Sequence, residues 1–366
     1  MNSHTIIPRN TSFAPRGTPH DPANRFEATS TDPFDDGWDT LADPTPPQDT
    51  ILIRDASRSI ISHNESPDLG FDRGLNPYRG CEHGCIYCYA RPTHAYLGFS
   101  AGLDFETKLI FKPEAAQLLE RELSRKSYIP APIVLGSNTD PYQPVERQLK
   151  LTRAVLDVLD RFNHPVSVIT KSAGVLRDAD ILARMAGRNL ARVHLSITTL
   201  DARLARAMEP RAATPSRRLA TVAMLSEAGI PVGVLAAPMI PGVNDSELEA
   251  ILEASAKAGA RSASAILLRL PHEVGALFED WLHRTMPERA RHVLSLIRQT
   301  RGGALNDAKF GSRFKGSGPY ADLLAARFRR AAAQYGLNHA PAPLDCAAFA
   351  RPNPPPGPGT QLSLAF

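Results

Sequence analysis

The stretch Gly80-Cys81-Glu82-His83-Gly84-Cys85-Ile86-Tyr87-Cys88-Tyr89 carries three of the four cysteines in a chain of 366 residues. Their spacing is Cys-x3-Cys-x2-Cys. Thiolates are soft ligands that select zinc, copper(I) or iron–sulfur clusters. Three thiolates can ligate three irons of a [4Fe–4S] cube and leave the fourth iron open to a further molecule. The spacing therefore predicts an iron–sulfur centre with an open coordination position.

Zinc is the competing interpretation, because His83 would complete a Cys3His set with Cys81, Cys85 and Cys88. Zinc modules usually separate their ligands into two short pairs, whereas all four candidates here lie in one run. A disulfide framework is disfavoured, since four cysteines are sparse and the polar opening of the chain does not resemble a secretory signal. The pattern favours the cluster, with zinc as the alternative.

Composition and charge limit the function classes. Hydrophobic residues make up 43% of the chain, enough for a sizeable core, and no apolar run is long enough to span a membrane. Reduced, metal-binding cysteines indicate the cytoplasm. The net charge of +4 is uneven: residues 1–50 hold eight acidic and three basic residues, whereas 284–330 hold eleven basic and three acidic ones. The basic segment indicates either a phosphate-rich partner or a solvated helical surface.

The chain divides into four segments by composition. Residues 1–50 carry eight prolines and no apolar periodicity, which predicts a disordered tail. Over 66–270, apolar strand-like runs alternate with helical stretches, which predicts a parallel α/β sheet. Residues 271–338 form a small, basic, helical C-terminal extension, and 339–366 a Pro-rich tail. Strands are expected at 133–135, 166–170, 193–197, 231–237 and 262–268, with one more before Cys81, and a helix at 145–162.

Further motifs flank the cysteine run or follow the predicted strands. They are Asn76-Pro77-Tyr78-Arg79-Gly80, Tyr89-Ala90-Arg91, Thr139-Asp140-Pro141-Tyr142-Gln143-Pro144, Lys171-Ser172, Glu209-Pro210-Arg211 and Pro238-Met239-Ile240-Pro241-Gly242-Val243-Asn244-Asp245. Together with the cysteines they resemble the spore-photolyase-like branch of the radical S-adenosylmethionine (SAM) superfamily, over roughly residues 66–270. The resemblance implies a partial (βα)6 barrel, a [4Fe–4S] cluster and SAM as cofactors, with the site at the C-terminal ends of the strands.

The resemblance also implies roles for single residues. Cys81, Cys85 and Cys88 would ligate the cluster, and Tyr87 would lie beside the adenine of SAM. The remaining expected SAM contacts lie at or near strand ends: Thr139, Lys171 toward the SAM carboxylate, Ser196 toward its ribose or carboxylate, and Ala236 or Ala237 toward the adenine. Read alone, a lysine at a strand end is often only solvated, and a buried serine often bonds to the backbone.

The resemblance implies radical chemistry, but one feature departs from the branch. An electron from an external donor would cleave SAM and give a 5′-deoxyadenosyl radical, which removes a hydrogen atom from the substrate. Spore photolyase itself uses a cysteine after the second strand as hydrogen-atom donor, and the corresponding stretch here, 136–140, has none. Tyr87 and Tyr89 remain candidate radical relays, with packing beside the cluster as the alternative.

The substrate class is open at this point. The last six residues place Gln361, Leu364 and Phe366 in the spacing of the peptide by which bacterial DNA-processing proteins dock on the replication sliding clamp. A clamp partner would agree with the basic segment and with damaged DNA as substrate. The alternatives are a radical SAM enzyme acting on a small molecule or a protein, and, in another class, a zinc-stabilised nucleic-acid-binding module.

Overall fold

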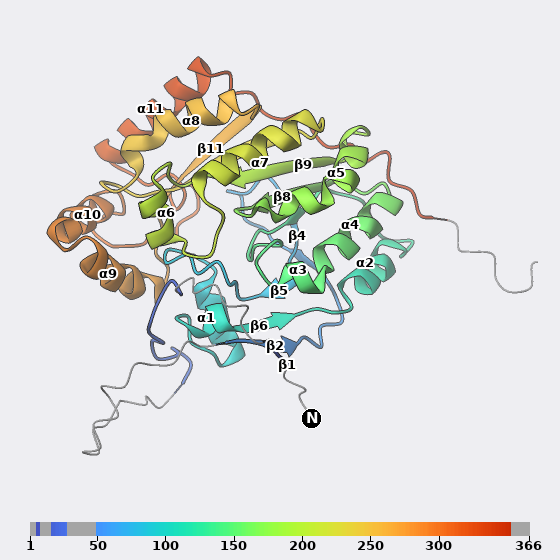
Figure 1. Cartoon of the computed structure of the whole chain (residues 1–366), viewed down its shortest axis with the longest axis horizontal. Helices are drawn as coiled ribbons and strands as arrows, with labels where there is room; N and C mark the ends of the chain where they lie inside the picture. Colours follow the sequence, from blue (N-terminus) through green and yellow to red (C-terminus); the bar gives the residue numbers. More distant parts are fainter. Residues whose placement is uncertain (1–4, 8–15, 28–48, 353–366) are drawn as a thin grey trace, which may run out of the picture.

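The computed structural model describes residues 5–7, 16–27 and 49–352, and its centre is a seven-stranded sheet (Figure 1). Six of these strands run parallel, in the order in which the chain makes them. They are β4 (Arg73–Leu75), β7 (Ile133–Leu135), β8 (Val166–Thr170), β9 (Ala191–Ser196), β10 (Val232–Met239) and β11 (Ser262–Leu267). The short β3 (Ile61–His63) pairs antiparallel with β4 at the edge. The predicted α/β fold with six β/α units is confirmed, and β4 is the expected strand before Cys81.

Helices between the strands cover one face of this sheet, as Figure 1 shows for α4, α5, α7 and α8. The elements are α2 (Ala115–Leu123), α3 (Glu146–Leu149), α4 (Leu151–Arg161), η3 (Ala173–Asp178), α5 (Ala179–Ala186), α6 (Ala202–Met208), α7 (Pro215–Glu227), η4 (Asp245–Glu247) and α8 (Leu248–Lys257). The single helix expected over 145–162 is two helices, because Lys150 takes a left-handed φ of 52° between them. The Glu146 carboxylate then accepts the Thr152 backbone N–H at 3.1 Å.

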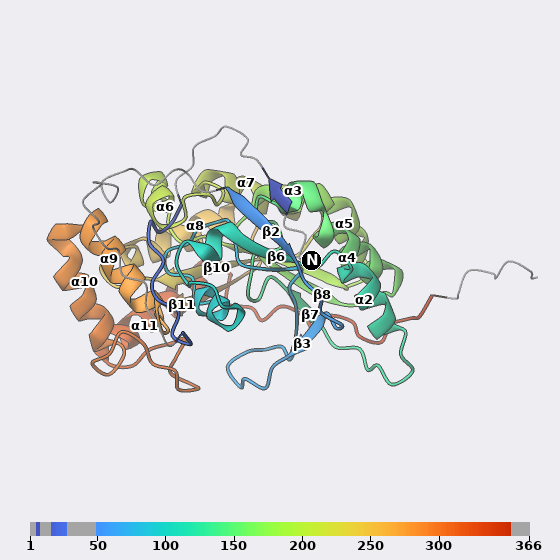
Figure 2. The ribbon, with the colours of Figure 1, turned by 90° about the horizontal axis from the view of Figure 1, so that it is seen from below.

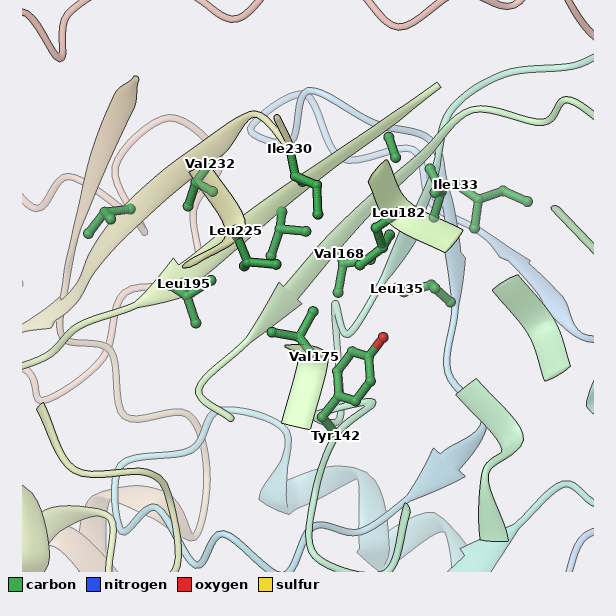
Figure 3. Packing of buried hydrophobic residues seen from close by; sticks show 14 of the residues in the cluster. Ile133, Leu135, Tyr142, Val168, Val175, Leu182, Leu195, Leu225, Ile230 and Val232 are labelled. Carbon is green, nitrogen blue, oxygen red and sulfur yellow. The ribbon is translucent and has the colours of Figure 1, made fainter. Parts of the chain in front are cut away.

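The main core lies between the sheet and these helices (Figure 3). Val168 and Leu195 on the strands pack with Leu182 and Leu225 on the covering helices, and all four are fully buried. Continuous apolar runs such as Ile133–Leu135 are typical of parallel strands, which are covered on their faces by the crossover helices. This packing fixes the strand ends, and therefore the loops that carry the motifs.

A second, smaller sheet lies beside the first, toward the bottom of Figure 1. Its order is β1 (Thr5–Ile7), β2 (Thr50–Arg54), β6 (Lys108–Phe111) and β5 (Tyr78–Arg79). Two short helices, η2 (Arg91–Leu97) and α1 (Asp104–Thr107), stand between β5 and β6. The cysteine run leaves β5 directly, so this small sheet sets where the run begins.

The C-terminal extension is helical, as expected, with α9 (Val274–Thr285), α10 (Pro287–Gln299) and α11 (Pro319–Gln334). Figure 2 shows α9 and α10 side by side at one end of the molecule. Their apolar faces form a second core with the cysteine run, in which Ile86 joins Phe278 and Trp281. The extension therefore packs against the cysteine run and supports it. Within the part of the chain that the structure describes, no helix is long and apolar enough to cross a membrane.

Parts of both predicted tails take defined positions. Residues 5–7 pair with β2, and Gly17 and Thr18 donate their backbone N–H groups to the Glu106 carboxylate at 2.8 and 3.2 Å. These hydrogen bonds to a buried side chain order a segment that has no apolar periodicity. Near the other end, Phe349 packs against Phe162. The proposed clamp peptide, 361–366, lies outside the described residues.

Candidate active site

The cysteine run begins with a tight turn at Gly80 and contains another at Gly84, with φ values of 81° and 69°. A Cβ on Gly80 would lie 2.9 Å from the Phe105 carbonyl oxygen, and one on Gly84 would lie 2.8 Å from the Glu106 carboxylate. Both positions therefore require glycine, through their backbone conformation and through the lack of space. The Cys81 N–H donates to the Phe105 carbonyl at 2.9 Å, which ties the run to α1.

The three thiols lie together at the edge of the interior. Cys81 and Cys85 are buried, and Cys88 is half-buried. Burial raises the pKa of both buried thiols, that of Cys85 to about 12, with the Glu209 carboxylate adding to the latter shift. A thiol binds metal as its thiolate, so these thiols release protons when a metal binds.

A buried ion pair holds the middle of the run. The Arg91 guanidinium lies 2.6 Å from the Glu106 carboxylate, and neither side chain is exposed to solvent. Arg91 Nε also donates to the Cys85 carbonyl at 3.0 Å. Gly17 lies directly against Gly84, since a Cβ on Gly17 would come within 1.7 Å of the Gly84 carbonyl oxygen. The N-terminal segment, residues 16–27, thus covers the cysteine run, and we call it the N-terminal cover. Arg91 holds the backbone of the cysteine run in place.

A second buried pair lies under Tyr87. The Tyr87 hydroxyl donates to the Glu209 carboxylate, which also pairs with Arg218 and accepts the Thr198 hydroxyl at 2.7 Å. Burial alone would raise the pKa of Glu209, but the Arg218 guanidinium and the Lys171 ammonium outweigh it and lower that pKa to about 2. Glu209 was visible in the sequence within its motif, whereas Arg218 lies in α7 and carried no signal.

Asp140 links the cysteine run to the end of β8. Its carboxylate lies 3.4 Å from His83 Nδ1 and accepts the Lys171 N–H and the Thr170 hydroxyl, both at 2.7 Å. Burial opposes ionisation of Asp140, but His83 and these hydrogen bonds lower its pKa to about 2. The His83 ring therefore lies against the Asp140 carboxylate. Across residues 16–27 and 49–352, no three His, Cys, Asp or Glu side chains group around a point where one metal ion could sit.

Comparison with known proteins gives the family. The model described as the radical SAM superfamily matches residues 75–254. An uncharacterized protein of Mycobacterium tuberculosis is 35% identical over 279 residues, covering 75% of this chain and 78% of the relative. An uncharacterized protein of Methanocaldococcus jannaschii is 29% identical over 196 residues, covering 54% of this chain and 70% of the relative. The chain belongs to the radical SAM superfamily.

Solved structures of similar fold agree with this assignment. Spore photoproduct lyase complexed with dinucleoside spore photoproduct superposes with a TM-score of 0.58 over 78% of this chain and 79% of that one, at 15% identity. A variant of the lyase with bound AdoMet and the same dinucleoside gives a TM-score of 0.57 over the same shares, at 16% identity. At such identities the match shows a shared fold.

Radical SAM proteins use a [4Fe–4S] cluster and SAM, and these are the cofactors of this chain. The donor set fits the cluster, because Cys81, Cys85 and Cys88 supply three soft sulfur ligands from one braced loop at the carboxyl ends of the strands. Each thiolate would bind a different iron of the cluster, so the three sulfur atoms need not converge on one point as they would around zinc.

Lys171 lies beside the cysteine run. It is half-buried after β8, with Nζ 5.9 Å from the centre of the Tyr87 ring. Among the described residues it forms no ion pair, since Glu209 pairs with Arg218 and Asp140 accepts only the Lys171 backbone N–H. Its ammonium is thus available to an anionic group, and contact with the SAM carboxylate stays a prediction.

The other predicted SAM contacts have protein partners of their own. The Thr139 hydroxyl donates to the Tyr78 carbonyl at 2.9 Å, and the Ser196 hydroxyl to the Ala237 carbonyl at 3.0 Å. The Ala236 side chain is fully buried in the main core, whereas Ala237, the stated alternative, is half-buried. Direct SAM contacts from these residues stay predictions. In the structure, the hydroxyls of Thr139 and Ser196 hold neighbouring backbone in place.

Tyr89 lies at the outer end of the cysteine run. Its hydroxyl donates to the Ser137 carbonyl, and 44% of the residue is exposed. The Arg269 guanidinium stacks on its ring, 4.8 Å from the centre. Tyr89 thus joins the end of β7 to the end of β11, and Arg269 is a site residue that the sequence analysis did not identify.

Proposed function

We propose that this radical SAM enzyme removes a hydrogen atom from a nucleic-acid substrate, with damaged DNA as the leading candidate. When bound, the reduced cluster and SAM supply the 5′-deoxyadenosyl radical that removes the hydrogen atom. Among the described residues three cysteines lie together in the site, enough for one cluster, so the electron comes from an external donor. The observation that carries the radical chemistry is the group of three thiols. Arg91 holds their loop in place, and Lys171, which forms no ion pair within the described part of the chain, lies nearby.

Nucleic acid is favoured as the substrate by the fold and by charge. The shared fold with spore photoproduct lyase, whose structure holds a dinucleoside spore photoproduct, is one support. The other is the basic extension, with eleven Lys and Arg residues against three acidic ones over 284–330. Since the stretch 136–140 after β7 has no cysteine, the fate of the substrate radical differs from that in the spore enzyme.

Tyr89 is our candidate for the radical relay. The Tyr87 hydroxyl is buried and donates to a carboxylate, so it is closed off from a substrate. The Tyr89 hydroxyl instead meets Ser137, in the stretch that follows β7, and the residue is partly exposed. A tyrosine that reaches this stretch can pass a hydrogen atom where a cysteine does so in the spore enzyme.

The first test is cluster assembly and SAM cleavage. After anaerobic reconstitution we expect about four irons and four sulfides per chain, as one [4Fe–4S] cluster requires, and 5′-deoxyadenosine after addition of dithionite and SAM. Cys88→Ala should lose both. Cys346→Ala is the matched control and should keep both, since Cys346 lies outside the run. Stoichiometric zinc without deoxyadenosine would overturn the radical chemistry.

The second test follows the hydrogen atom. Ultraviolet-irradiated DNA with deuterated thymidine is incubated with the reduced, reconstituted enzyme and SAM, and the deoxyadenosine is examined by mass spectrometry. Transfer of deuterium from DNA into deoxyadenosine is the expected result. Deoxyadenosine without deuterium, both from this DNA and from fully deuterated DNA or RNA, would exclude nucleic acid and leave a small molecule or a protein as the substrate.

A further inference from the structure

A row of alternating aromatic and arginine side chains runs outward from the cysteine run. We call Tyr89, Arg269, Phe314, Arg313 and Phe310 the stacking row. The Arg269 guanidinium lies 4.8 Å from the Tyr89 ring centre and 5.2 Å from that of Phe314. The Arg313 guanidinium lies 4.7 Å from the Phe314 ring centre and 4.8 Å from that of Phe310. The row is therefore continuous from the neighbour of Cys88 to the loop between α10 and α11.

Arg269 has a charge without a partner. It follows β11 and is half-buried, and across residues 16–27 and 49–352 no carboxylate forms an ion pair with it. Its Nε is buried without a hydrogen-bond acceptor. A guanidinium held between two rings and left without an acceptor is costly unless an anionic group completes it. The guanidinium as a whole, half-buried and without an ion pair to the described residues, is therefore open to an anionic ligand.

The rest of the row is held rigidly. The Leu267 N–H donates to the Phe314 carbonyl at 2.9 Å, which fixes the loop to the end of β11. Arg301 is buried and donates to the carbonyls of Leu268 and Arg313. Arg313 in turn lies 2.7 Å from the Asp68 carboxylate of the β3–β4 loop. Because these contacts already hold the surface in place, a ligand that binds there does not have to offset the conformational entropy of ordering it.

Both ends of the row are open to solvent. Tyr89 is 44% exposed and Phe310 is 62% exposed. The exposed Phe310 stacks on Arg313, and the exposed Lys309 and Lys315 are close by in the chain. Single-stranded nucleic acids bind surfaces of this kind. Unpaired bases stack on aromatic rings, while cationic side chains take the phosphates. In Figure 2 this loop lies at the lower edge, beside the β3–β4 loop.

We propose that the stacking row binds an unpaired nucleic-acid strand, with Phe310 stacking a base and Arg269 taking a phosphate. This rests on the nucleic-acid substrate proposed above and adds the path of the strand toward the cluster. Because Tyr89 follows Cys88 directly, a strand along the row ends beside the reacting centre. A paired duplex has its bases stacked on one another, so the row selects single strands or bases that have left the helix.

The test measures binding by the reconstituted, full-length enzyme to a fluorescein-labelled single-stranded DNA of twelve nucleotides, by anisotropy over a series of NaCl concentrations. Loss of one base stack should make Phe310→Ala bind about 5- to 100-fold more weakly. Loss of one phosphate contact should make the log–log salt slope of Arg269→Gln shallower by about 0.7. Arg269→Lys keeps the charge and should keep the slope, which guards against a folding defect in the glutamine variant.

Two control variants match these changes away from the stacking row. Leu323→Ala removes an apolar side chain that is 58% exposed on α11, and Arg121→Gln removes an exposed charge from α2, outside the basic segment. Both should bind as the unchanged protein does. A second readout uses 2-aminopurine in the strand, whose fluorescence is quenched by stacking. Phe310→Ala should lose part of this quenching.

The outcomes separate the two proposals. If the unchanged enzyme binds DNA and the row variants bind equally well, the stacking row is wrong and the nucleic-acid substrate stands. If the unchanged enzyme binds neither single strands nor duplexes, both proposals fail. If it binds the duplex of the same sequence as tightly as the single strand, the stacking of unpaired bases is overturned.

Discussion

The Arg91 guanidinium and the Glu106 carboxylate form an ion pair in which neither side chain is exposed to solvent. Glu106 also accepts the N–H groups of Gly17 and Thr18, and Arg91 donates to the Cys85 carbonyl. One pair thus joins the N-terminal cover to the cysteine run. Its main effect is to fix the backbone that presents the thiols.

Breaking this pair should destabilise the protein and impair cluster loading. Arg91→Met leaves the Glu106 carboxylate buried without its counter-charge, which costs about 3–5 kcal/mol. We expect this loss in urea unfolding, together with less iron per chain after reconstitution. Arg161→Met, which removes an exposed pair with Glu120, should cost no more than about 1 kcal/mol and leave the iron content unchanged. Equal stability losses in the two variants would contradict the structural role of the buried pair.

Lys171→Met should weaken SAM binding without removing the cluster. A hydrogen bond to a charged group contributes about 1.5–3 kcal/mol, so we expect about 10- to 150-fold weaker binding in equilibrium dialysis with the reconstituted protein. Lys257→Met removes an exposed lysine on α8 and serves as the control. An unchanged SAM affinity in Lys171→Met would assign Lys171 to packing over Tyr87 alone.

Tyr89→Phe should separate SAM cleavage from substrate turnover. The variant keeps the ring that stacks on Arg269 but loses the hydroxyl that meets Ser137. Deoxyadenosine should still form, while product from the nucleic-acid substrate falls about 100-fold or more, the size of loss typical when a positioned proton-transfer group is removed. The ratio of product to deoxyadenosine is the measurement. Tyr96→Phe, at an exposed tyrosine of η2, should leave that ratio unchanged, and an unchanged ratio in Tyr89→Phe would remove Tyr89 as a relay.

His164 should make stability depend on pH. Burial lowers its pKa to about 4, and the neutral ring can donate from Nδ1 to the Pro165 carbonyl while Nε2 accepts the Tyr128 hydroxyl. In the unfolded chain the pKa is about 6.5, so between pH 6.5 and 4 the unfolded state binds the extra proton. Stability is therefore present above pH 6.5 and is lost as the pH falls toward 4, by about 1–3 kcal/mol.

Urea unfolding at pH 7 and pH 4.5 checks this dependence. His164→Gln should lose less stability over this interval than the unchanged protein. His339→Gln, at an exposed histidine, should lose as much as the unchanged protein. Parallel pH curves for His164→Gln and the unchanged protein would show that His164 does not carry the dependence.

The sequence predicted the sheet well for a physical reason. Ile133–Leu135 and Val166–Thr170 are strands with the expected bounds, because a short apolar run between turn residues has few other ways to be buried. The cysteine spacing likewise indicates its chemistry without any tertiary information. The break of the expected helix at Lys150 was not visible, since it depends on the capping of Thr152 by Glu146.

Much of the site depends on partners far apart in the chain. Arg91 stands in one of the sequence motifs and Glu106 in none, and only the fold shows that the two form a buried pair. Arg269 was not predicted for the same reason. The two rings on which it stacks are Tyr89 of the cysteine run and Phe314 of a loop after α10. The sequence also did not predict that the segment around Gly17 is ordered. Its backbone donates to the distant Glu106 carboxylate, and such a hydrogen bond does not appear in the pattern of side chains.

The N-terminal cover has a consequence for biosynthesis. Arg25, at the end of the cover, pairs with Glu273, 248 residues further along the chain. At roughly 5–20 residues per second, ribosomes need about 12–50 s to make that interval. Until Glu273 has been made, the cover lacks its far anchor while the three cysteines already exist. The nascent chain thus passes through an interval in which the thiols are present and the final closure is not.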